Sequence, residues 1–234
     1  MMRTVGILGG MGPEATVLLM QRVIEACPAR DDAGHVPLLV DQNPAVPSRI
    51  KALIEGTGPS PEPVLVAMAR RLEAAGAEAL AMPCNTAHAY GDTIRAAVAL
   101  PFLDMIGLSA GALAAVLPAG GRVGMLASPA VRHARVFDAA LSVRGLIPVW
   151  PEDEAALLAL IRAVKAGRKG AGAEADLARI AGALVRQTGC GAVLVACTEL
   201  SLLTPGLAPG LPAATPWLDS LDLLATAIVD FARG

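Results

Sequence analysis

The sequence has no excess of charge of either sign. Its 234 residues include 19 Lys and Arg against 21 Asp and Glu, which gives a formal net charge of −2. Proteins that bind nucleic acid or anionic membrane surfaces usually carry a basic patch, so this balance argues against both kinds of partner. We therefore expect the partner to be a small molecule.

The sequence also lacks a clear membrane-spanning segment, although 54% of its residues are hydrophobic. The uncharged stretch at residues 105–121 is interrupted by glycines and Pro118, and it is shorter than the ~20 residues that a spanning helix needs. A buried parallel sheet explains the hydrophobicity better, because strands covered on both faces are apolar throughout. The first residues form a glycine-rich strand pattern and no signal-peptide core, so we expect a cytoplasmic protein.

Cysteine and histidine are both scarce. The four cysteines, at positions 27, 84, 190 and 197, include no C-x-x-C pair and do not indicate a disulfide framework. A zinc site would need further thiol or imidazole ligands at close spacing. His88 would have to turn back from a helix to meet Cys84, so we expect His35, His88 and His133 on the surface or at helix ends. The sequence thus predicts no metal site.

Two of the cysteines close matched apolar runs. Gly76 lies eight residues before Cys84, and Gly189 lies eight residues before Cys197. Each run is short enough for a buried parallel strand, and small hydrogen-bonding residues follow each cysteine. Ligands of open α/β sheets bind outside the carboxyl ends of the strands, so we expect both thiols to face one crevice from opposite sides. Cys27 and Cys190 lack this context, and we expect them to be packing residues.

The rest of the chain alternates strand and helix signals, and its second half repeats the plan of the first. Residues 123–128 echo residues 5–10 at an offset of 118, the cysteine runs lie 113 apart, and a Leu-Pro pair recurs at an offset of 111. These echoes predict an α/β protein of two pseudo-symmetric lobes, each a parallel sheet flanked by helices. We expect residues 1–102 and 211–234 in the first lobe, and residues 103–210 in the second. Strands are expected at 4–9, 35–41, 100–105 and 146–149, with helices at 13–27, 62–75, after Thr86, from 129, from 152 to 165, and from 219.

A glycine turn follows the first expected strand. Gly10-x-Gly12-x-x-Ala15 leaves backbone N–H groups at a helix N-terminus, where an anion could bind. The same spacing fits a dinucleotide fingerprint, but no acidic residue ends a second strand at the spacing that fingerprint requires; Asp41 lies 31 positions after Gly10. Nucleotide binding is therefore disfavoured.

Two thiols that face one substrate carbon can act as a base and an acid. A free thiol has a pKa of ~8.5, and a helix N-terminus after each cysteine would favour the thiolate. A lone nucleophilic cysteine would need a histidine partner and an oxyanion hole, and it would leave the second cysteine unexplained. The pattern favours a racemase, in which one thiol removes a proton and the other delivers one to the opposite face.

Three motifs resemble those of the aspartate/glutamate racemase family, in particular its aspartate racemase branch. They are GILGGMGP at residues 6–13, MPCNTAH at 82–88 and ACTEL at 196–200. The resemblance implies a cofactor-independent isomerase, without pyridoxal phosphate, that interconverts L- and D-aspartate or glutamate. It also implies an active site between two α/β lobes, and a homodimer.

The same resemblance assigns roles to individual residues. Cys84 and Cys197 match the proton-transfer cysteines, and Arg49 and Lys165 match residues that hold substrate carboxylates. Ser48 stands where some aspartate racemases carry an acidic residue. The other expected substrate-binding residues are Met11, Asn85, Thr86, Ala87, Ser128, Thr198 and Glu199.

From the residues alone, purely structural interpretations of these side chains remain open. Arg49 could be a solvated charge on a short helix, Lys165 a helix C-terminal charge, and Glu199 a charge that merely favours a helix N-terminus. Among whole functions, the alternatives are a related superfamily isomerase or decarboxylase with one working cysteine, a broad-specificity amino-acid racemase, a two-lobed dicarboxylate-binding protein, and a dinucleotide-dependent oxidoreductase.

Overall fold

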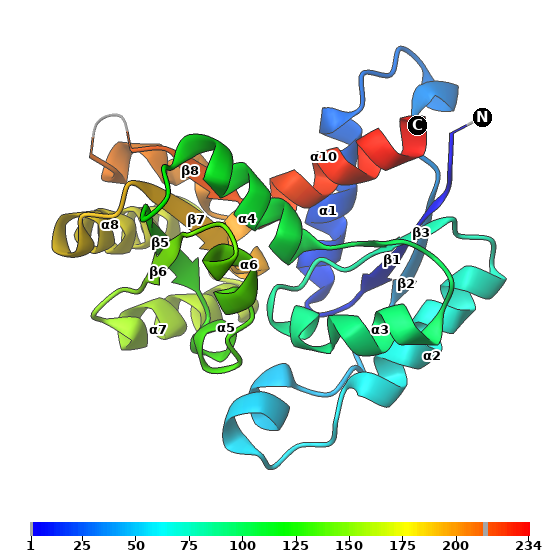
Figure 1. Cartoon of the computed structure of the whole chain (residues 1–234), viewed down its shortest axis with the longest axis horizontal. Helices are drawn as coiled ribbons and strands as arrows, with labels where there is room; N and C mark the ends of the chain where they lie inside the picture. Colours follow the sequence, from blue (N-terminus) through cyan, green and yellow to red (C-terminus); the bar gives the residue numbers. More distant parts are fainter. Residues whose placement is uncertain (1, 213–214) are drawn as a thin grey trace. The chain divides into compact units, whose positions relative to one another are not determined.

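The computed structural model describes residues 2–212 and 215–234, and the chain folds into two compact units (Figure 1). The first unit comprises Met1–Met105 and Leu221–Gly234, and the second is Ile106–Ser220. Each unit has its own four-stranded parallel sheet with helices around it. The prediction of two α/β lobes, each a parallel sheet flanked by helices, is confirmed. The chain crosses between the units twice, at Met105–Ile106 and at Ser220–Leu221.

The sheet of the first unit has the strand order β2-β1-β3-β4. All its neighbouring strands are parallel, and every residue of β1 is buried. This explains why the first strand is apolar throughout, without polar alternation. Its strands are β1 (Val5–Gly9), β2 (Leu38–Gln42), β3 (Ala79–Ala81) and β4 (Phe102–Leu103).

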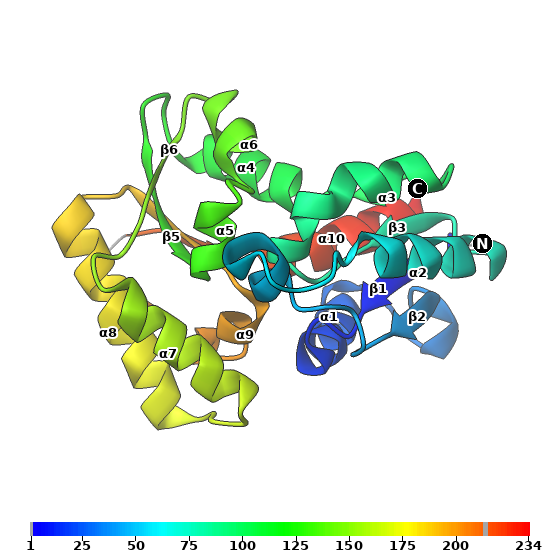
Figure 2. The ribbon, with the colours of Figure 1, turned by 90° about the horizontal axis from the view of Figure 1, so that it is seen from below.

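Helices cover both faces of this sheet, with α1 on one side and α2 and α3 on the other (Figure 2). Helix α1 begins at Pro13 with Glu14 in its first turn, because proline needs no N–H partner there and a carboxylate complements the helix dipole. An ion pair of 3.3 Å between Arg22 and Asp222 joins α1 to α10. The helices are α1 (Pro13–Ala26), α2 (Glu62–Ala74), α3 (Gly91–Ala97) and α10 (Ser220–Arg233), with 3₁₀ turns at Asp32–Gly34 and Thr86–Tyr90 and a π-helical turn at Lys51–Glu55.

The second unit repeats this topology with the order β6-β5-β7-β8. In both sheets the first strand of the unit lies between the second and the third, which agrees with the predicted internal duplication. The strands are β5 (Arg122–Ala127), β6 (Ile147–Val149), β7 (Ala192–Ala196) and β8 (Trp217–Asp219). The helices are α4 (Met105–Val116), α5 (Pro129–His133), α6 (Asp138–Ser142), α7 (Glu154–Lys165), α8 (Ala171–Thr188) and α9 (Thr198–Ser201), with 3₁₀ turns at Thr204–Gly206 and Ala208–Gly210.

Side chains of β7 alternate between two buried clusters, as the two-residue period of a strand requires. Ala192, Leu194 and Ala196 pack with residues of α4, α5 and α6. Val193 and Val195 pack with residues of α7 and α8, and Cys197 continues on that same face just after the strand. The strand therefore directs the Cys197 side chain toward the α7 side of its sheet.

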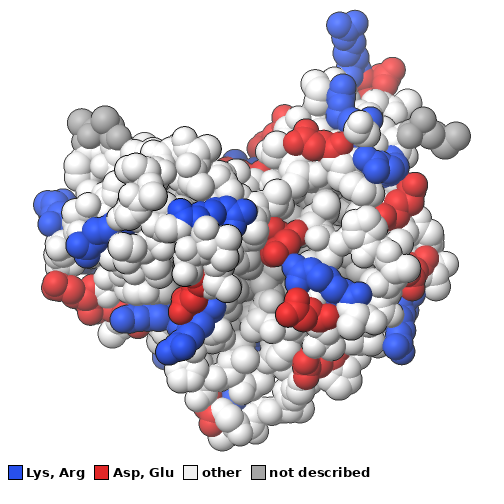
Figure 3. All heavy atoms as spheres, in the orientation of Figure 1, with Lys and Arg blue, Asp and Glu red and all other residues white. Residues whose placement is uncertain are grey.

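Charged residues make up 17% of the sequence. On the face drawn in Figure 3, acidic and basic residues are interspersed and separated by wide uncharged areas. Within residues 2–212 and 215–234, no helix is both long and apolar enough to cross a membrane.

Candidate active-site residues

The candidate residues of the first unit lie at the carboxyl end of β3. Cys84 follows this strand by three residues and is 6% exposed. Its backbone N–H donates to the Met82 carbonyl at 2.8 Å, and the Ala87 N–H donates to the Cys84 carbonyl at 3.1 Å. The Cys84 side chain shares one buried cluster with Met11 and Ala87. Three of the predicted residues are thus brought together within one unit.

The glycine turn after β1 is set by a close backbone approach. Gly10 has φ +91°, and a Cβ there would lie 2.4 Å from the Asn43 carbonyl carbon, so no other residue fits without rearrangement. The Gly10 N–H donates to Thr16 Oγ1 at 2.9 Å. The expectation that this turn holds its N–H groups ready for an anion is therefore wrong for Gly10, because a threonine of α1 already occupies that donor.

Arg49 is fixed against the same turn. Its guanidinium donates to the carbonyls of Val46 at 3.2 Å and Pro47 at 3.0 Å, and to the carbonyl of Met11 at 3.4 Å. The side chain is only partly exposed. Backbone carbonyls thus fix the Arg49 guanidinium beside the Met11 turn, so it is not a freely solvated charge. Its role in binding a carboxylate remains a prediction.

His88 is a functional candidate that the sequence analysis placed wrongly. Its side chain is 2% exposed, with Nδ1 2.9 Å from the Cys84 carbonyl oxygen and Nε2 4.0 Å from Asp104 Oδ1. The ring also packs against Phe102, with centroids 5.4 Å apart. The segment after Cys84 is a 3₁₀ turn, Thr86–Tyr90, which directs residue 88 back toward the cysteine backbone. The four-residue spacing from Cys84 was the available signal.

The burial of His88 leads to a pH prediction for stability. Burial lowers the pKa of His88 below its ordinary 6.5, while the Cys84 carbonyl and Asp104 oppose this shift and Arg95 adds to it. A lowered folded-state pKa contributes stability that is present above pH 6.5 and is lost as the pH falls through the folded value. We expect the free energy of unfolding to fall below pH 6.5, and to fall less steeply in His88→Asn. Urea titrations at several pH values measure this, and parallel curves for both proteins would contradict it.

The candidate residues of the second unit lie at the carboxyl end of β7. Cys197 directly follows this strand and is 6% exposed. Its Sγ donates to Glu199 Oε2 at 3.1 Å, and Glu199 Oε1 lies 3.2 Å from Nζ of Lys165, the last residue of α7. Glu199 therefore links the thiol to the lysine. Lys165 and Glu199 thus pair with each other as well as standing at helix ends, and their substrate-binding roles remain predictions.

The electrostatics of Cys197 contradict the expectation of a stabilised thiolate. Burial raises the pKa of Cys197 well above its ordinary value, and the charge and hydrogen bond of Glu199 raise it further, while Lys165 acts in the opposite direction. The helix that follows, α9, has only four residues, so its dipole is small. Cys197 is accordingly a protonated thiol at neutral pH.

The remaining predicted residues flank these strand ends. Asn85 and Thr86 follow Cys84, and Thr198 follows Cys197, with Asn85 and Thr198 each 3% exposed. Ser128 is 6% exposed between β5 and the first residue of α5, Pro129. Their roles in substrate binding remain predictions.

The other cysteines are placed for packing. Cys27 and Cys190 are 7% and 5% exposed, and all four cysteines are free thiols. Cys27 Sγ donates to the Gly34 carbonyl at 3.3 Å, and Cys190 Sγ lies 2.7 Å from where a Cβ at Gly124 would be. Among the described residues, no cluster of three His, Cys, Asp or Glu side chains could hold a metal ion.

The structure thus defines a duplicated α/β protein in which each unit presents one thiol at the carboxyl end of a central strand. The chain belongs to the Asp/Glu/hydantoin racemase family, whose model matches residues 8–228. This confirms the family that the three sequence motifs predicted.

Solved structures of family members have the same fold. Picrophilus torridus aspartate racemase superposes with a TM-score of 0.84 at 28% identity, over 99% of this chain and 94% of that one. A putative Asp/Glu racemase from Yersinia pestis gives a TM-score of 0.78 at 21% identity, over 100% of both chains. An alignment with the broad specificity amino-acid racemase RacX of Bacillus subtilis has 30% identity over 115 residues. It spans 44% of this chain and 45% of RacX, which is less than half the length of that relative.

Proposed function

We propose that the protein is a cofactor-independent amino-acid racemase in which Cys84 and Cys197 exchange protons with opposite faces of one α-carbon. The observation that carries this proposal is the equivalent placement of two buried, free cysteines, each just after the third strand of its unit. A single-cysteine isomerase needs only one such thiol, and a dicarboxylate-binding protein needs neither. Family membership supports the same reaction class.

The electrostatics favour unequal starting roles for the two thiols. Cys197 is protonated, with its S–H directed to Glu199, so it can deliver a proton to a carbanion. The two-base reaction then requires Cys84 to act as the base that takes the α-proton from the other face. After this step Cys84 carries the new S–H and Cys197 the negative charge, which the Lys165 ammonium stabilises. The opposite enantiomer is converted by the reverse sequence.

We propose a dicarboxylic amino acid, aspartate or glutamate, as the substrate. Two held cations support this: Arg49, fixed by carbonyls around the Met11 turn, and Lys165, beside Glu199. A guanidinium can bind a carboxylate through two parallel hydrogen bonds, whereas an ammonium acts as a point charge. The named activity of the Picrophilus protein agrees with aspartate, and that of RacX leaves a wider substrate range as the second candidate.

A panel of single-enantiomer amino acids tests the function. The purified protein is incubated with each amino acid without added cofactor, and the products are separated on a chiral column. We expect aspartate or glutamate to approach an equal mixture of enantiomers from either side. Racemisation of neutral amino acids alone would overturn the dicarboxylate assignment. If no amino acid were racemised while dicarboxylates raised the melting temperature, the binding-protein alternative would hold instead.

Arg49 provides a prediction about substrate binding. Arg49→Ala should raise KM for the best dicarboxylic substrate by about 10-fold or more, because a hydrogen bond to a charged group contributes about 1.5–3 kcal/mol. Arg49→Lys should recover only part of this, since a point charge replaces a planar fork. Steady-state kinetics measure both, with Arg71→Lys as control because Arg71 pairs with Asp41 on the surface. An unchanged KM and kcat in Arg49→Ala would exclude this substrate class.

We propose a homodimer in a reducing compartment such as the cytoplasm. The chemistry needs free thiols, and disulfides are rare under reducing conditions. Val17 and Ile24 are 59% and 57% exposed and lie seven residues apart on one face of α1. Ile24 also lines a cavity of about 430 Å³, together with Met20 and Val36. Neighbouring exposed apolar side chains mark interaction surfaces, and a second copy of the chain would cover them. A single-chain mass by light scattering would exclude the dimer.

A further inference from the structure

An aspartate stands at the same place before each crossing of the chain between units. Asp104 directly follows β4 and Asp219 ends β8, so each closes the fourth strand of its sheet. Each also directly precedes a helix, α4 or α10, that begins at the crossing (Figure 1). Asp104 is two residues before Ile106, and Asp219 is two residues before Leu221, the first residues of the other unit.

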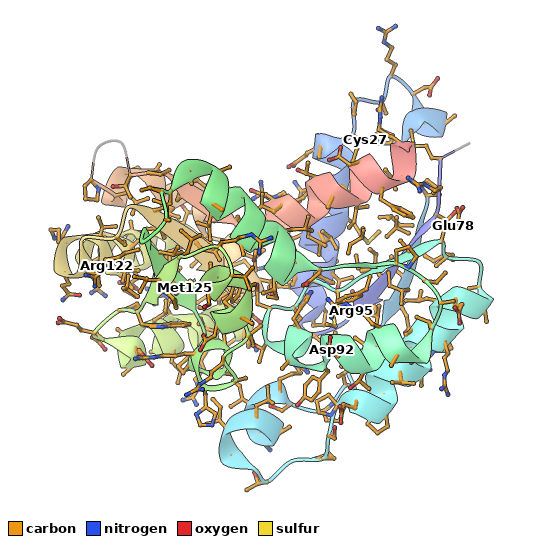
Figure 4. All side chains as sticks on the ribbon, viewed as in Figure 1. Cys27, Glu78, Asp92, Arg95, Arg122 and Met125 are labelled. Atoms are coloured by element: carbon orange, nitrogen blue, oxygen red, sulfur yellow. The ribbon has the colours of Figure 1, made fainter. Side chains whose placement is uncertain are left out.

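In the first unit, Asp104 contacts the segment that follows Cys84. Its Oδ1 lies 4.0 Å from His88 Nε2, and the other ring nitrogen of His88 is hydrogen-bonded to the Cys84 carbonyl. Its Oδ2 lies 3.0 Å from Arg95, a residue of α3 that also pairs with Asp92 at 2.7 Å (Figure 4). The His88 ring is therefore hydrogen-bonded to the backbone of Cys84, and the carboxylate of the residue before the crossing acts on its other nitrogen through charge, at 4.0 Å.

In the second unit, Asp219 contacts the segment that follows Cys197. Ser201 Oγ donates to Asp219 Oδ1 at 2.8 Å, and the two residues are 0% and 3% exposed. The Ser201 N–H donates to the Cys197 carbonyl at 3.2 Å. A buried hydrogen bond to a carboxylate is strong because no water competes for it.

The two arrangements share a sequence spacing. His88 is the fourth residue after Cys84, and Ser201 is the fourth residue after Cys197. In both units this residue is hydrogen-bonded to the cysteine carbonyl: His88, in a 3₁₀ turn, through its ring Nδ1, and Ser201, in α9, through its backbone N–H. The pair is His–Asp in one unit and Ser–Asp in the other, so the two units share the sequence spacing, whereas the contacts differ: 4.0 Å between His88 and Asp104, and a 2.8 Å hydrogen bond between Ser201 and Asp219.

We propose that Asp104 and Asp219 are positioning residues, each of which couples the backbone of one cysteine to a crossing between the units. Asp104 acts on Cys84 through His88, and Asp219 acts on Cys197 through Ser201. A movement of either crossing then shifts the thiol tied to it, and the placement of each thiol depends on its own aspartate. The catalytic part of this inference rests on the proposed racemase function.

Exchange of the substrate α-proton in heavy water tests separately whether Asp104 positions Cys84 and whether Asp219 positions Cys197. In a Cys197→Ala background only the Cys84 thiol can exchange the proton, and in a Cys84→Ala background only the Cys197 thiol can. We expect Asp104→Ala and His88→Ala to slow exchange by about 10- to 100-fold in the first background, because small misplacements of a reacting group cost that much. Ser201→Ala and Asp219→Ala should do so in the second background. Each variant should change the exchange rate of the other thiol, measured in the other background, by no more than about 2-fold. The reason is that substitutions at separated sites act nearly independently.

Alkylation of the thiols tests the placement without any need for racemase activity. Iodoacetamide labelling in the otherwise unchanged chain, followed by mass spectrometry of the cysteine peptides, gives a rate for each thiol. We expect Ser201→Ala to change the alkylation rate of Cys197 several-fold and to leave the rate of Cys84 unchanged. Asp104→Ala should change the rate of Cys84 several-fold and leave that of Cys197 unchanged. His88→Asn, which keeps a donor for the Cys84 carbonyl but removes Nε2, should behave as Asp104→Ala does.

The controls and outcomes separate this inference from the function. Asp41→Asn and Asp176→Asn remove carboxylates that pair with surface arginines, one in each unit, and should change neither readout. Equal effects on both thiols, or effects no larger than those of the controls, would overturn the coupling. If some variant fails to fold by circular dichroism, the near-isosteric Ser201→Ala and His88→Asn decide. Thiol-specific alkylation changes with no amino-acid exchange in any protein would support the positioning and reject the racemase.

Discussion

Replacing Cys84 or Cys197 with alanine should abolish racemisation, lowering kcat by about 10²- to 10⁴-fold or more, because each change removes a positioned acid or base. Either loss leaves the carbanion without its opposite-face donor or the substrate without its base. Chiral chromatography with each pure enantiomer measures the rate. Cys27→Ala and Cys190→Ala are matched controls, because these thiols are about equally buried but do not follow the carboxyl end of a strand: Cys27 is the C-cap residue of α1, and Cys190 precedes β7. We expect both controls to keep kcat, with at most some loss of stability.

Exchange of the α-proton in heavy water distinguishes a mechanism with two catalytic thiols from a mechanism with one. Each single variant should still exchange the α-proton of the enantiomer whose hydrogen faces the surviving thiol, and the two variants should prefer opposite enantiomers. In the unaltered enzyme, product should form already deuterated while the remaining substrate stays largely unlabelled at early times. Full racemase activity in either variant, or the same preference in both, would exclude a two-base mechanism.

Removing the charge of Glu199 should have the second largest effect. Glu199→Gln replaces the charged acceptor of the Cys197 proton with a neutral amide and removes the charge that raises the Cys197 pKa, so that pKa should fall. Lys165 would also lose its carboxylate partner. We expect kcat/KM to fall by about 10- to 100-fold, as for other lost hydrogen bonds to charged groups. Because the equilibrium constant between enantiomers is one, the loss must be equal in both directions.

The pH profile shows whether Glu199 acts through the thiol. Activity should decline as the pH rises through the pKa of the protonated thiol, since racemisation needs one proton donor. Glu199→Gln should move this alkaline limb to lower pH, whereas Glu154→Gln, which removes the carboxylate paired with Arg132 on the surface, should leave it in place. An unchanged alkaline limb in Glu199→Gln would mean that Glu199 does not tune Cys197.

The parts of the fold that the sequence predicted depend on local patterns. Apolar runs bounded by glycine marked β1, β5 and β7, and Pro13 marked the start of α1, because burial on both faces and the N-terminal helix turn constrain residue type directly. The half-chain echoes revealed the duplication because the same constraints on residue type act on the equivalent strands of both units. Helix α8 is not among the expected elements, although its C-terminal Gly189 adopts the left-handed conformation.

The parts that sequence reasoning missed depend on tertiary contacts. His88 looked like a surface residue because a continuous helix after Cys84 would carry it away, yet the segment is a 3₁₀ turn against Phe102. The raised pKa of Cys197 comes from burial and from Glu199, whose side-chain direction has no sequence signature. The sequence did not decide whether Arg49 is fixed or freely solvated, because backbone carbonyls hold its guanidinium and every residue has such a carbonyl.

The two crossings of the chain also bear on the order of folding during synthesis. The second unit, Ile106–Ser220, is one continuous segment, whereas the first needs Leu221–Gly234 to complete it. Helix α10 supplies Asp222 to Arg22, and the Ala232 carbonyl accepts from the Arg3 N–H at 2.9 Å. A ribosome therefore finishes the second unit before it has made the last helix of the first. Although amino-terminal domains usually fold first, here the inserted unit that carries Cys197 is complete earlier, and the unit that begins the chain must wait for its end.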